Sequence, residues 1–267
     1  MASRAERLTD LLLGLLAGAT FLVLYAPVLI GALFSLVTVD RAGIHWETAT
    51  FAWYGKLLDN QSILDAIRTT AIVGGIAVCL ASVLAVALAL YVEWEGALFR
   101  RLVELVIYLP FLLPPIVTGL SLLIFFVGAG MQRGFPTLIV GHTIFVLAVI
   151  FRLVQTRLQS LSRSLVEASS DLGASRWQTL RWVLWPQLRP AVATGAILAF
   201  TLSFDETLIS VFLAGDTTTL PLRLWAMMRV GFSPQINALV TIVLLVSIVL
   251  TIVIGARMKS IEQGAEE

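Results

Sequence analysis

The sequence has little charge, a single cysteine and only two histidines. Charged residues make up 13% of the 267 residues and hydrophobic residues 58%, whereas a soluble domain carries about a quarter charged residues. This composition excludes an ordinary soluble enzyme and a disordered or nucleic-acid-binding chain. Because Cys79 is the single cysteine, a disulfide framework or a CxxC metal site within the chain is excluded. His45 and His142 are too few for a multi-histidine metal site.

The few charges are spaced so that long apolar segments separate them. A spanning helix needs roughly 20 apolar residues, and an arginine can extend from a slightly shorter segment toward the interface. Five charge-free gaps meet this requirement, and a sixth apolar stretch is interrupted by Asp205 and Glu206. We therefore predict an all-α integral membrane protein with six spanning helices. The predicted spans are Leu11–Val37, Thr69–Val92, Leu102–Val127, Leu138–Phe151, Ala191–Ala214 and Ala238–Ile254.

Basic residues are distributed unevenly between the two sides that six spans would define. The side with both termini carries 12 of the 18 Lys and Arg residues, and the other side carries six. Cytoplasmic loops are enriched in Lys and Arg, so we expect both termini in the cytoplasm. The first apolar run is about twice as long as the apolar part of a secretory signal peptide, which favours an uncleaved anchor helix.

Prolines interrupt the third predicted span at Pro110, Pro114 and Pro115. A proline inside a spanning helix kinks it and frees backbone carbonyl groups. The kink is either a packing feature or a broken helix that lines a substrate path. The prolines alone favour the packing kink.

The segment of residues 152–189 has the pattern of a helix–turn–helix on the cytoplasmic side. Gly173 can end the first helix in a left-handed turn. Residues Ser175 to Gln178 form a capping box that can start the second helix, which Pro186 and Pro190 are expected to limit. Such an ordered segment predicts a docking surface for a cytoplasmic partner. Leucines recur at helical spacing in the first helix: Leu158, Leu161, Leu165 and Leu172.

The same segment resembles the EAA loop of ATP-binding-cassette (ABC) importer permeases. In that family a Glu-Ala-Ala sequence is followed four residues later by Gly, and a Pro follows thirteen residues after that Gly, as Pro186 follows Gly173 here. Ser169 stands where the family usually has Ala, and Trp185 where it usually has Leu. The residues that carry the resemblance are Glu167-Ala168-Ser169-Ser170-Asp171-Leu172-Gly173-Ala174-Ser175, then Trp185-Pro186 and Pro190.

Other segments resemble the polyamine (spermidine/putrescine) branch of these permeases. They are Gly141-His142-Thr143, Leu202–Glu206, Phe212–Gly215, Leu220–Leu222 and Val230–Ala238. A proline that the family often has near Leu147 is absent, and the overall pattern is similar to the second of the two permeases in such an operon. The resemblance implies the type I importer permease fold. It divides the chain into an anchor helix with an outer loop (1–65), a transmembrane domain (66–257) with the EAA loop at 155–190, and a cytoplasmic tail (258–267).

The resemblance also implies a mechanism and a set of partners. The EAA segment would be a coupling helix seated on a separate ATPase, because the sequence has no G-x-x-x-x-G-K-[ST] phosphate loop. ATP and Mg would be bound by that ATPase, and this chain would be non-catalytic and hold no cofactor. The expected surroundings are two ATPase subunits, a second related permease, a periplasmic or extracellular solute-binding protein and the lipid of a bacterial inner membrane, with no nucleic acid. The coupling residues implied are Glu167, Ala168, Asp171, Leu172, Gly173, Ala174 and Pro186.

Asp205 and Glu206 form an adjacent acidic pair inside a predicted span. A carboxylate in hydrocarbon costs about 2.5–3.5 kcal/mol on insertion scales, so each needs a compensating partner. The pair is either structural or part of a cation site in the substrate path. Neighbouring residues on a helix point about 100° apart, so we expect one to face the path and the other to pack against a neighbour. His142 and Cys79 are expected to be a hydrogen-bonded helix histidine and a buried apolar residue.

The favoured function is therefore an ATP-driven importer permease for polyamines. Ferric iron, an aminophosphonate, thiamine or another small organic solute is the alternative within the same class. A secondary transporter that works without ATP is an alternative of another class, and would show inverted repeats or several intramembrane charges. A membrane-embedded enzyme would need clustered His, Asp or Glu at helical spacing, and ranks last.

Overall fold

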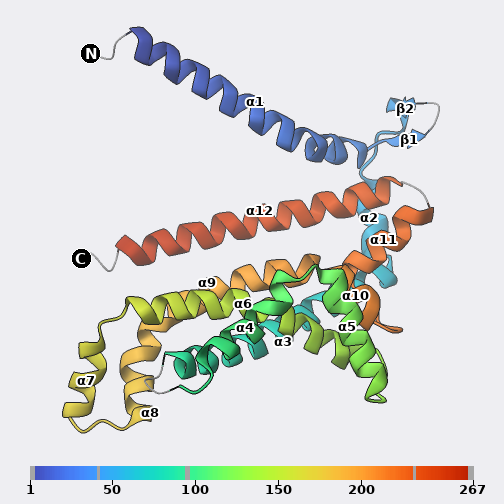
Figure 1. Ribbon diagram of the computed structural model, residues 1–267. Coiled ribbons are helices and arrows are strands. Elements are labelled where there is room, and N and C mark those ends of the chain that lie inside the picture. Colours follow the sequence, from blue (N-terminus) through green and yellow to red (C-terminus); the bar gives the residue numbers. More distant parts are fainter. Residues whose placement is uncertain (1–3, 41–42, 94–96, 231–232, 264–267) are drawn as a thin grey trace. The chain divides into compact units, whose positions relative to one another are not determined.

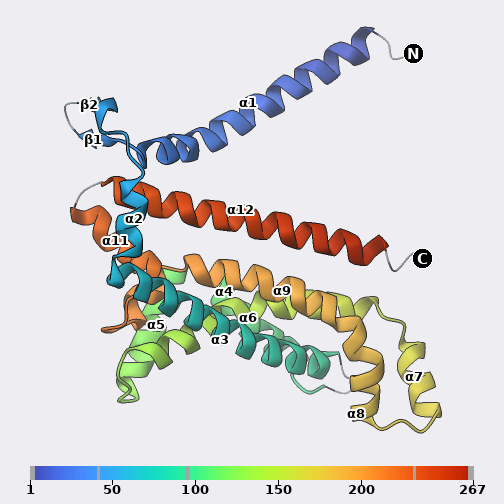
Figure 2. The same ribbon diagram turned by 180° about the vertical axis from the view of Figure 1, so that it is seen from behind.

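The computed structural model describes residues 4–40, 43–93, 97–230 and 233–263, which are mostly helical. The backbone contacts divide the chain into two units. The smaller unit combines Met1–Leu64 with Ala226–Glu267, and the larger unit is Asp65–Trp225. Figures 1 and 2 show the chain from opposite sides.

The smaller unit contains the first and last helices. Val39 of β1 pairs with Ile44 of β2 in an antiparallel hairpin. Asn237 of α12 donates a hydrogen bond to the carbonyl oxygen of Phe34 at 3.4 Å, which links this helix to the end of α1. The elements are α1 (Arg4–Phe34), β1 (Thr38–Asp40), β2 (Gly43–His45), the 3-10 helix η1 (Trp46–Thr48), α2 (Ala52–Leu58) and α12 (Pro234–Gln263).

Helix α1 is apolar and unburied. Its span Asp10–Phe34 carries leucine, valine and phenylalanine side chains on all sides, and 0% of its apolar window is buried inside the chain. An exposed apolar surface of this length is not stable in water. An apolar helix of this length suits the hydrocarbon of a membrane.

The larger unit is built from the helices between α3 and α11. Figures 1 and 2 show α7 and α8 together at one end of this unit, with α5 and α10 at the other. The elements are α3 (Gln61–Val92), α4 (Arg100–Leu112), α5 (Pro115–Gly128), α6 (Phe135–Ser160), α7 (Arg163–Asp171), α8 (Arg176–Gln178), the π-helical turn η2 (Thr179–Leu184), α9 (Trp185–Asp205), α10 (Leu208–Leu213) and α11 (Leu220–Val230).

Helix α6 is the centre of the larger unit, and α9 runs along it (Figure 1). The two helices approach closely at Gly195, where a Cβ atom would lie 3.2 Å from the Cα of Ile150. Phe151, Leu138 and Leu188 are fully buried in the same core. Close helix contacts of this kind use small residues because they let the backbones approach.

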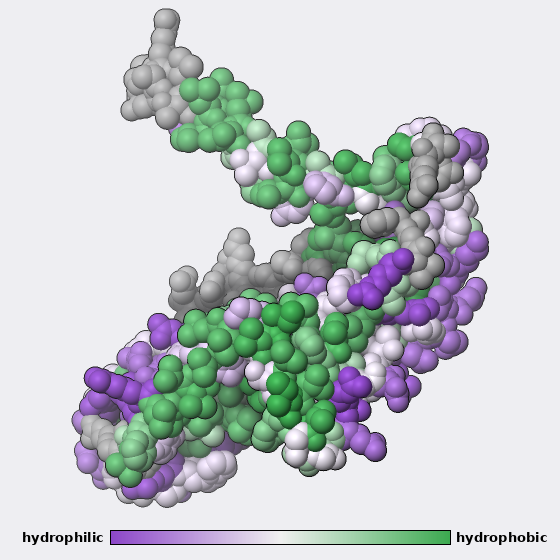
Figure 3. Space-filling view, turned by 45° about the vertical axis from the view of Figure 1, so that its right-hand side comes forward, coloured by the Kyte–Doolittle hydropathy of each residue, from purple (hydrophilic) through white to green (hydrophobic). Residues whose placement is uncertain are grey.

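Among the described residues, three helices are long and apolar enough to cross a membrane: Asp10–Phe34, Gln61–Val92 and Phe135–Ser160. Helices α4 and α5 would together make a fourth span. In Figure 3 hydrophobic side chains cover the middle of the larger unit, and hydrophilic ones gather at the end with α7 and α8. The chain has the features of a helical membrane protein, while six spans with cytoplasmic termini stay a prediction.

The third predicted span is broken rather than kinked. Helices α4 and α5 meet at an angle of 110°. Leu113 and Pro114, which each precede a proline, have extended backbones with ψ of 146° and 135°, because a residue before proline is sterically driven out of the helical region. Two such residues in succession stop the helix. The packing kink favoured by the sequence was therefore wrong.

Three further expectations were also wrong. Pro186 and Pro190 do not limit the second helix of the 152–189 segment, since helical structure continues from Arg176 to Asp205. Proline has no backbone N–H to donate to the preceding turn. The backbone hydrogen-bond pattern changes to that of a π-helix just before Pro186, and the helical structure continues past it. The predicted fifth span Ala191–Ala214 is broken at Glu206. Cys79 is exposed instead of buried, because it lies on a face of α3 that the other described helices of the larger unit leave uncovered.

Candidate functional sites

The turn after α7 is built by local hydrogen bonds. Gly173 has a left-handed backbone with φ of 78°, as its place at the helix end predicts. Its N–H donates to the carbonyl oxygen of Ser170 at 2.9 Å, and the N–H of Ala174 donates to the carbonyl oxygen of Ser169 at 3.1 Å. These two bonds are the Schellman pattern that closes a helix C-terminus. The chain is thereby reversed between Leu172 and Ser175.

The next helix begins with the predicted capping box. The hydroxyl oxygen of Ser175 accepts from the Gln178 N–H at 3.3 Å, and the Ser175 N–H donates to Oε1 of Gln178 at 2.7 Å. The hydroxyls of Ser169 and Thr179 share a buried hydrogen bond of 2.9 Å between the two helices. The helix–turn–helix is therefore held by its own polar side chains.

Most of the expected coupling residues lie in the second half of α7 and in the turn that follows it, whereas Pro186 lies near the start of α9. Leu172 is 88% exposed at the tip of the turn. A shallow groove of about 320 Å³ lies beside it, and Trp182, which the sequence did not suggest for this role, lines its wall. An exposed leucine beside a groove is a surface suited to docking another protein. Glu167, Ala168, Asp171, Leu172, Gly173 and Pro186 are exposed, and Ala174 is half-buried.

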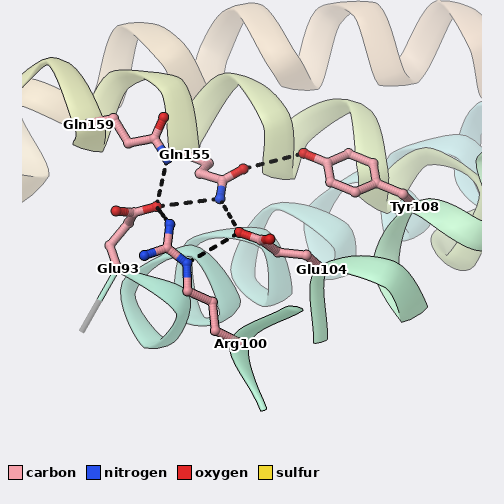
Figure 4. A network of polar contacts seen from close by, with 6 residues as sticks. All are labelled: Glu93, Arg100, Glu104, Tyr108, Gln155 and Gln159. Carbon is pink, nitrogen blue, oxygen red and sulfur yellow. Dashed lines mark hydrogen bonds and ion pairs between the residues drawn. The ribbon is translucent and has the colours of Figure 1, made fainter. Parts of the chain in front are cut away.

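A polar network joins α6 to α4 and to the end of α3 (Figure 4). The buried Gln155 donates to Oε1 of Glu104 at 2.8 Å and to Oε1 of Glu93 at 3.3 Å. Arg100 pairs with the same two carboxylates, at 3.0 Å to Glu93 and 3.5 Å to Glu104. Because α6 leads directly into α7, the network connects the turn to two further helices. Its members are Glu93, Arg100, Glu104, Tyr108, Gln155 and Gln159.

The two adjacent acids stand at the break of the fifth predicted span. Asp205 is the last residue of α9 and is exposed. Glu206 is only 8% exposed, and its carboxylate accepts the Ile209 N–H at 2.9 Å, so it satisfies a backbone donor in the first turn of α10. The chain therefore uses Glu206 to start α10 and leaves the Asp205 carboxylate without such a structural role.

His142 of α6 faces this break. Its side chain is buried, with Nδ1 2.8 Å from the hydroxyl of Ser203 in α9 and Nε2 3.0 Å from the hydroxyl of Ser210 in α10. This confirms the prediction of a hydrogen-bonded helix histidine. That it contacts both sides of the break could not be read from the sequence, because the partners lie 61 and 68 residues away.

A family model described as "Binding-protein-dependent transport system inner membrane component" matches residues 81–266. The chain belongs to this family of transport permeases. It is 37% identical over 239 residues to the spermidine/putrescine transport system permease protein PotC of Escherichia coli K12, covering 88% of this chain and 89% of PotC. It is 35% identical over 241 residues to the putrescine transport system permease protein PotI of the same strain, covering 86% and 84%.

Solved structures of ABC importers share the fold of this permease. One is a bacterial ABC transporter involved in the import of the acidic polysaccharide alginate, with a TM-score of 0.76, 18% identity and coverage of 96% of this chain and 98% of the other. Another is the MetNI methionine ABC transporter in an inward-facing conformation, with a TM-score of 0.62, 20% identity and coverage of 73% and 94%. The expected importer permease fold is thereby confirmed.

Proposed function

We propose that this permease subunit carries polyamines such as spermidine or putrescine through an ATP-driven importer. The observation that carries the proposal is the exposed carboxylate of Asp205 at the break between α9 and α10. The similarity to PotC and PotI over most of the chain supports the substrate class.

The position of Asp205 suits an organic cation. It ends α9, where the last carbonyl groups of a helix carry partial negative charge. A broken helix in a membrane exposes such carbonyls toward a cavity, where they bind cations in other transporters. A primary ammonium group can donate to a carboxylate and to carbonyl oxygens together, so Asp205 and the end of α9 would attract one end of a polyamine.

The exposed turn around Leu172 is the proposed docking site for the ATPase. Two ATPase subunits, a second related permease and an extracellular or periplasmic binding protein complete the proposed assembly in a bacterial inner membrane. The permease itself has six spans with both termini in the cytoplasm, carries its transport domain in residues 66–257, and catalyses no reaction. ATP binding would draw the exposed turn of this permease toward the equivalent turn of the second permease. Helices α6 and α9 would transmit the movement.

Uptake of labelled spermidine and putrescine by whole cells tests the cation site. Asp205→Asn should lower uptake at least tenfold per permease molecule. Glu206→Gln should have a smaller effect, because the amide oxygen can still accept from Ile209. Asp216→Asn, which removes the same charge from an exposed position after α10, is the matched control. Unchanged uptake in Asp205→Asn would remove this residue from the path.

A second experiment tests coupling in the reconstituted importer. Glu167→Lys reverses the charge on the exposed face of α7 and should separate ATP hydrolysis from uptake, while membrane insertion stays normal. Glu167→Gln keeps the size of the side chain and should be milder. If both variants transport normally, the turn is not the coupling site.

If the importer accumulates ferric iron, an aminophosphonate or thiamine instead of polyamine, the substrate assignment is wrong while the importer assignment stands.

A further inference from the structure

One buried side chain joins the two halves of the broken helix. His142, which is 2% exposed, contacts Ser203 two residues before the end of α9 and Ser210 in α10. The break between these helices consists of Glu206 and Thr207. A single imidazole therefore spans the break, with one nitrogen on each side.

The hydrogen bonds around His142 run in one direction. The Ser210 hydroxyl donates its only hydrogen to the carbonyl oxygen of Glu206 at 2.8 Å, so it can only accept from Nε2 of His142. Nε2 must then carry a proton. In the neutral imidazole Nδ1 is an acceptor, and it receives the hydroxyl hydrogen of Ser203. The chain of donors runs from Ser203 through His142 and Ser210 to the Glu206 carbonyl.

This chain replaces a helical hydrogen bond that the break has removed. In a continuous helix the Glu206 carbonyl would accept from the backbone N–H four residues later. Here it accepts from the Ser210 side chain, whose oxygen is held in turn by the imidazole. A buried donor chain of this kind is cooperative, and removing one member leaves the others unpaired. The imidazole thereby stabilises the broken form of the helix over a straight one.

We propose that His142 is a positioning residue for translocation, which holds the break open so that the Asp205 carboxylate faces the substrate path. The proposal rests on the proposed function for the role of Asp205, but the geometry of the bridge does not depend on the solute. His142 itself does not touch the solute. Its loss should therefore lower the rate of turnover and leave the half-saturating solute concentration unchanged.

The proton assignment is tested first, in the assembled importer labelled with ¹⁵N-histidine. The difference between the spectra of the wild type and His142→Gln isolates the two ring nitrogens of His142. We expect a protonated Nε2 and an unprotonated Nδ1. A proton on Nδ1 alone would overturn the assigned direction of the chain.

The position of the break is tested by thiol labelling, which needs no transport. In a Cys79→Ser background, Asp205→Cys provides a single thiol in this chain. Adding His142→Gln should change the rate of its modification by a water-soluble maleimide several-fold, and adding His45→Gln, on the hairpin of the other unit, should not. An unchanged rate in the His142 variant overturns the proposal, whatever the uptake by Asp205→Asn shows.

Uptake then tests the function of the bridge. His142→Gln keeps an amide donor for Ser210, and with that amide in the place of Nε2 no atom of glutamine takes the place of Nδ1. It should therefore break the same bond as Ser203→Ala. Each variant should lower maximal uptake per molecule about two- to tenfold, which is the factor that corresponds to the net free energy of one hydrogen bond. The double variant should be no worse than His142→Gln alone. Additive losses, or a changed half-saturating concentration with an unchanged maximal rate, would contradict a positioning role.

Discussion

Ser169 and Thr179 share a hydrogen bond of 2.9 Å between their hydroxyl oxygens, and both side chains are buried. The bond connects α7 to the π-helical turn across the exposed turn at Leu172. The resemblance to the EAA loop leads us to expect alanine at Ser169, and this contact gives the serine a structural role. In this chain, the polar pair lies at the base of the proposed docking site.

The first prediction concerns this pair. Ser169→Ala should destabilise the helix–turn–helix by about 1 kcal/mol, because one buried hydrogen bond is lost and Thr179 retains only a 3.3 Å bond to the Ser175 carbonyl. Amide hydrogen exchange in residues 163–184 of the assembled importer would measure the change. Ser170→Ala is the control, since its exposed hydroxyl bonds only to Val166 within α7. Equal protection in both variants would show that the pair is not stabilising.

The second prediction concerns the conformation of Gly173. A Cβ atom at this position would meet nothing within 4 Å, so a substitution there is limited by its positive φ alone. Gly173→Ala should cost about 1–2 kcal/mol and lower uptake, whereas Gly173→Asn should be tolerated better because asparagine adopts this conformation more readily. Gly75→Ala, at an open position inside α3, should be neutral or slightly stabilising. Equal effects of alanine and asparagine at Gly173 would contradict this account.

The features that the sequence predicted correctly depend on neighbouring residues. Gly173 ends α7, and Ser175 with Gln178 starts α8, because the hydrogen bonds of each cap join residues within a few positions. The different environments of Asp205, which is exposed, and Glu206, which is buried, were expected only as a consequence of helical geometry. The actual cause is a break that gives one acid a capping role.

The features that the sequence failed to predict depend on distant residues. The broken fifth span is held by His142, which lies more than 60 residues before its partners. The glycine before it, Gly141, lets Leu213 approach so closely that a Cβ atom would overlap with its Cδ1. Periodicity along the chain contains no information about either contact. The sharp bend after Leu113 was also missed, because one proline usually kinks a spanning helix whereas two successive extended residues stop it.

The third prediction concerns the network around Gln155. Gln155→Glu would place a third carboxylate beside Glu93 and Glu104, with Arg100 as the neighbouring cation. We expect it to abolish uptake and to lower the thermal stability of the importer. Gln155→Leu, which removes the two donated bonds and the bond accepted from Tyr108 without adding charge, should cost about 1–3 kcal/mol.

Tyr108→Phe provides the matched control for this network, since it removes a single hydrogen bond of 3.3 Å to Gln155. Its effect on thermal stability should be the smallest of the three variants. If Gln155→Glu is as stable and active as Tyr108→Phe, the network does not connect α6 to α4 in the functional importer.

The fourth prediction separates backbone strain from steric contact at two glycines. Gly130 and Gly215 both have left-handed backbones, with φ of 73° and 56°. A Cβ atom on Gly130 would meet nothing within 4 Å, whereas on Gly215 it would lie 2.6 Å from the carbonyl oxygen of Arg133. Both alanine variants should therefore lose about 1–2 kcal/mol to the strained backbone, and Gly215→Ala should lose about 1–3 kcal/mol more, because the backbone must move.

The contact at Gly215 lies where the end of α10 meets the start of α6. The Leu213 carbonyl accepts from the Gly134 N–H at 3.0 Å and from the Thr137 hydroxyl at 2.9 Å. Moving this backbone apart should disturb both bonds and loosen α10, which carries Ser210 of the bridge to His142. Gly215→Ala should therefore lower uptake as well as the melting temperature, while Gly130→Ala lowers the melting temperature less and leaves uptake near normal. Equal melting temperatures for the two variants would show that strain alone, without the contact to Arg133, accounts for the need for glycine.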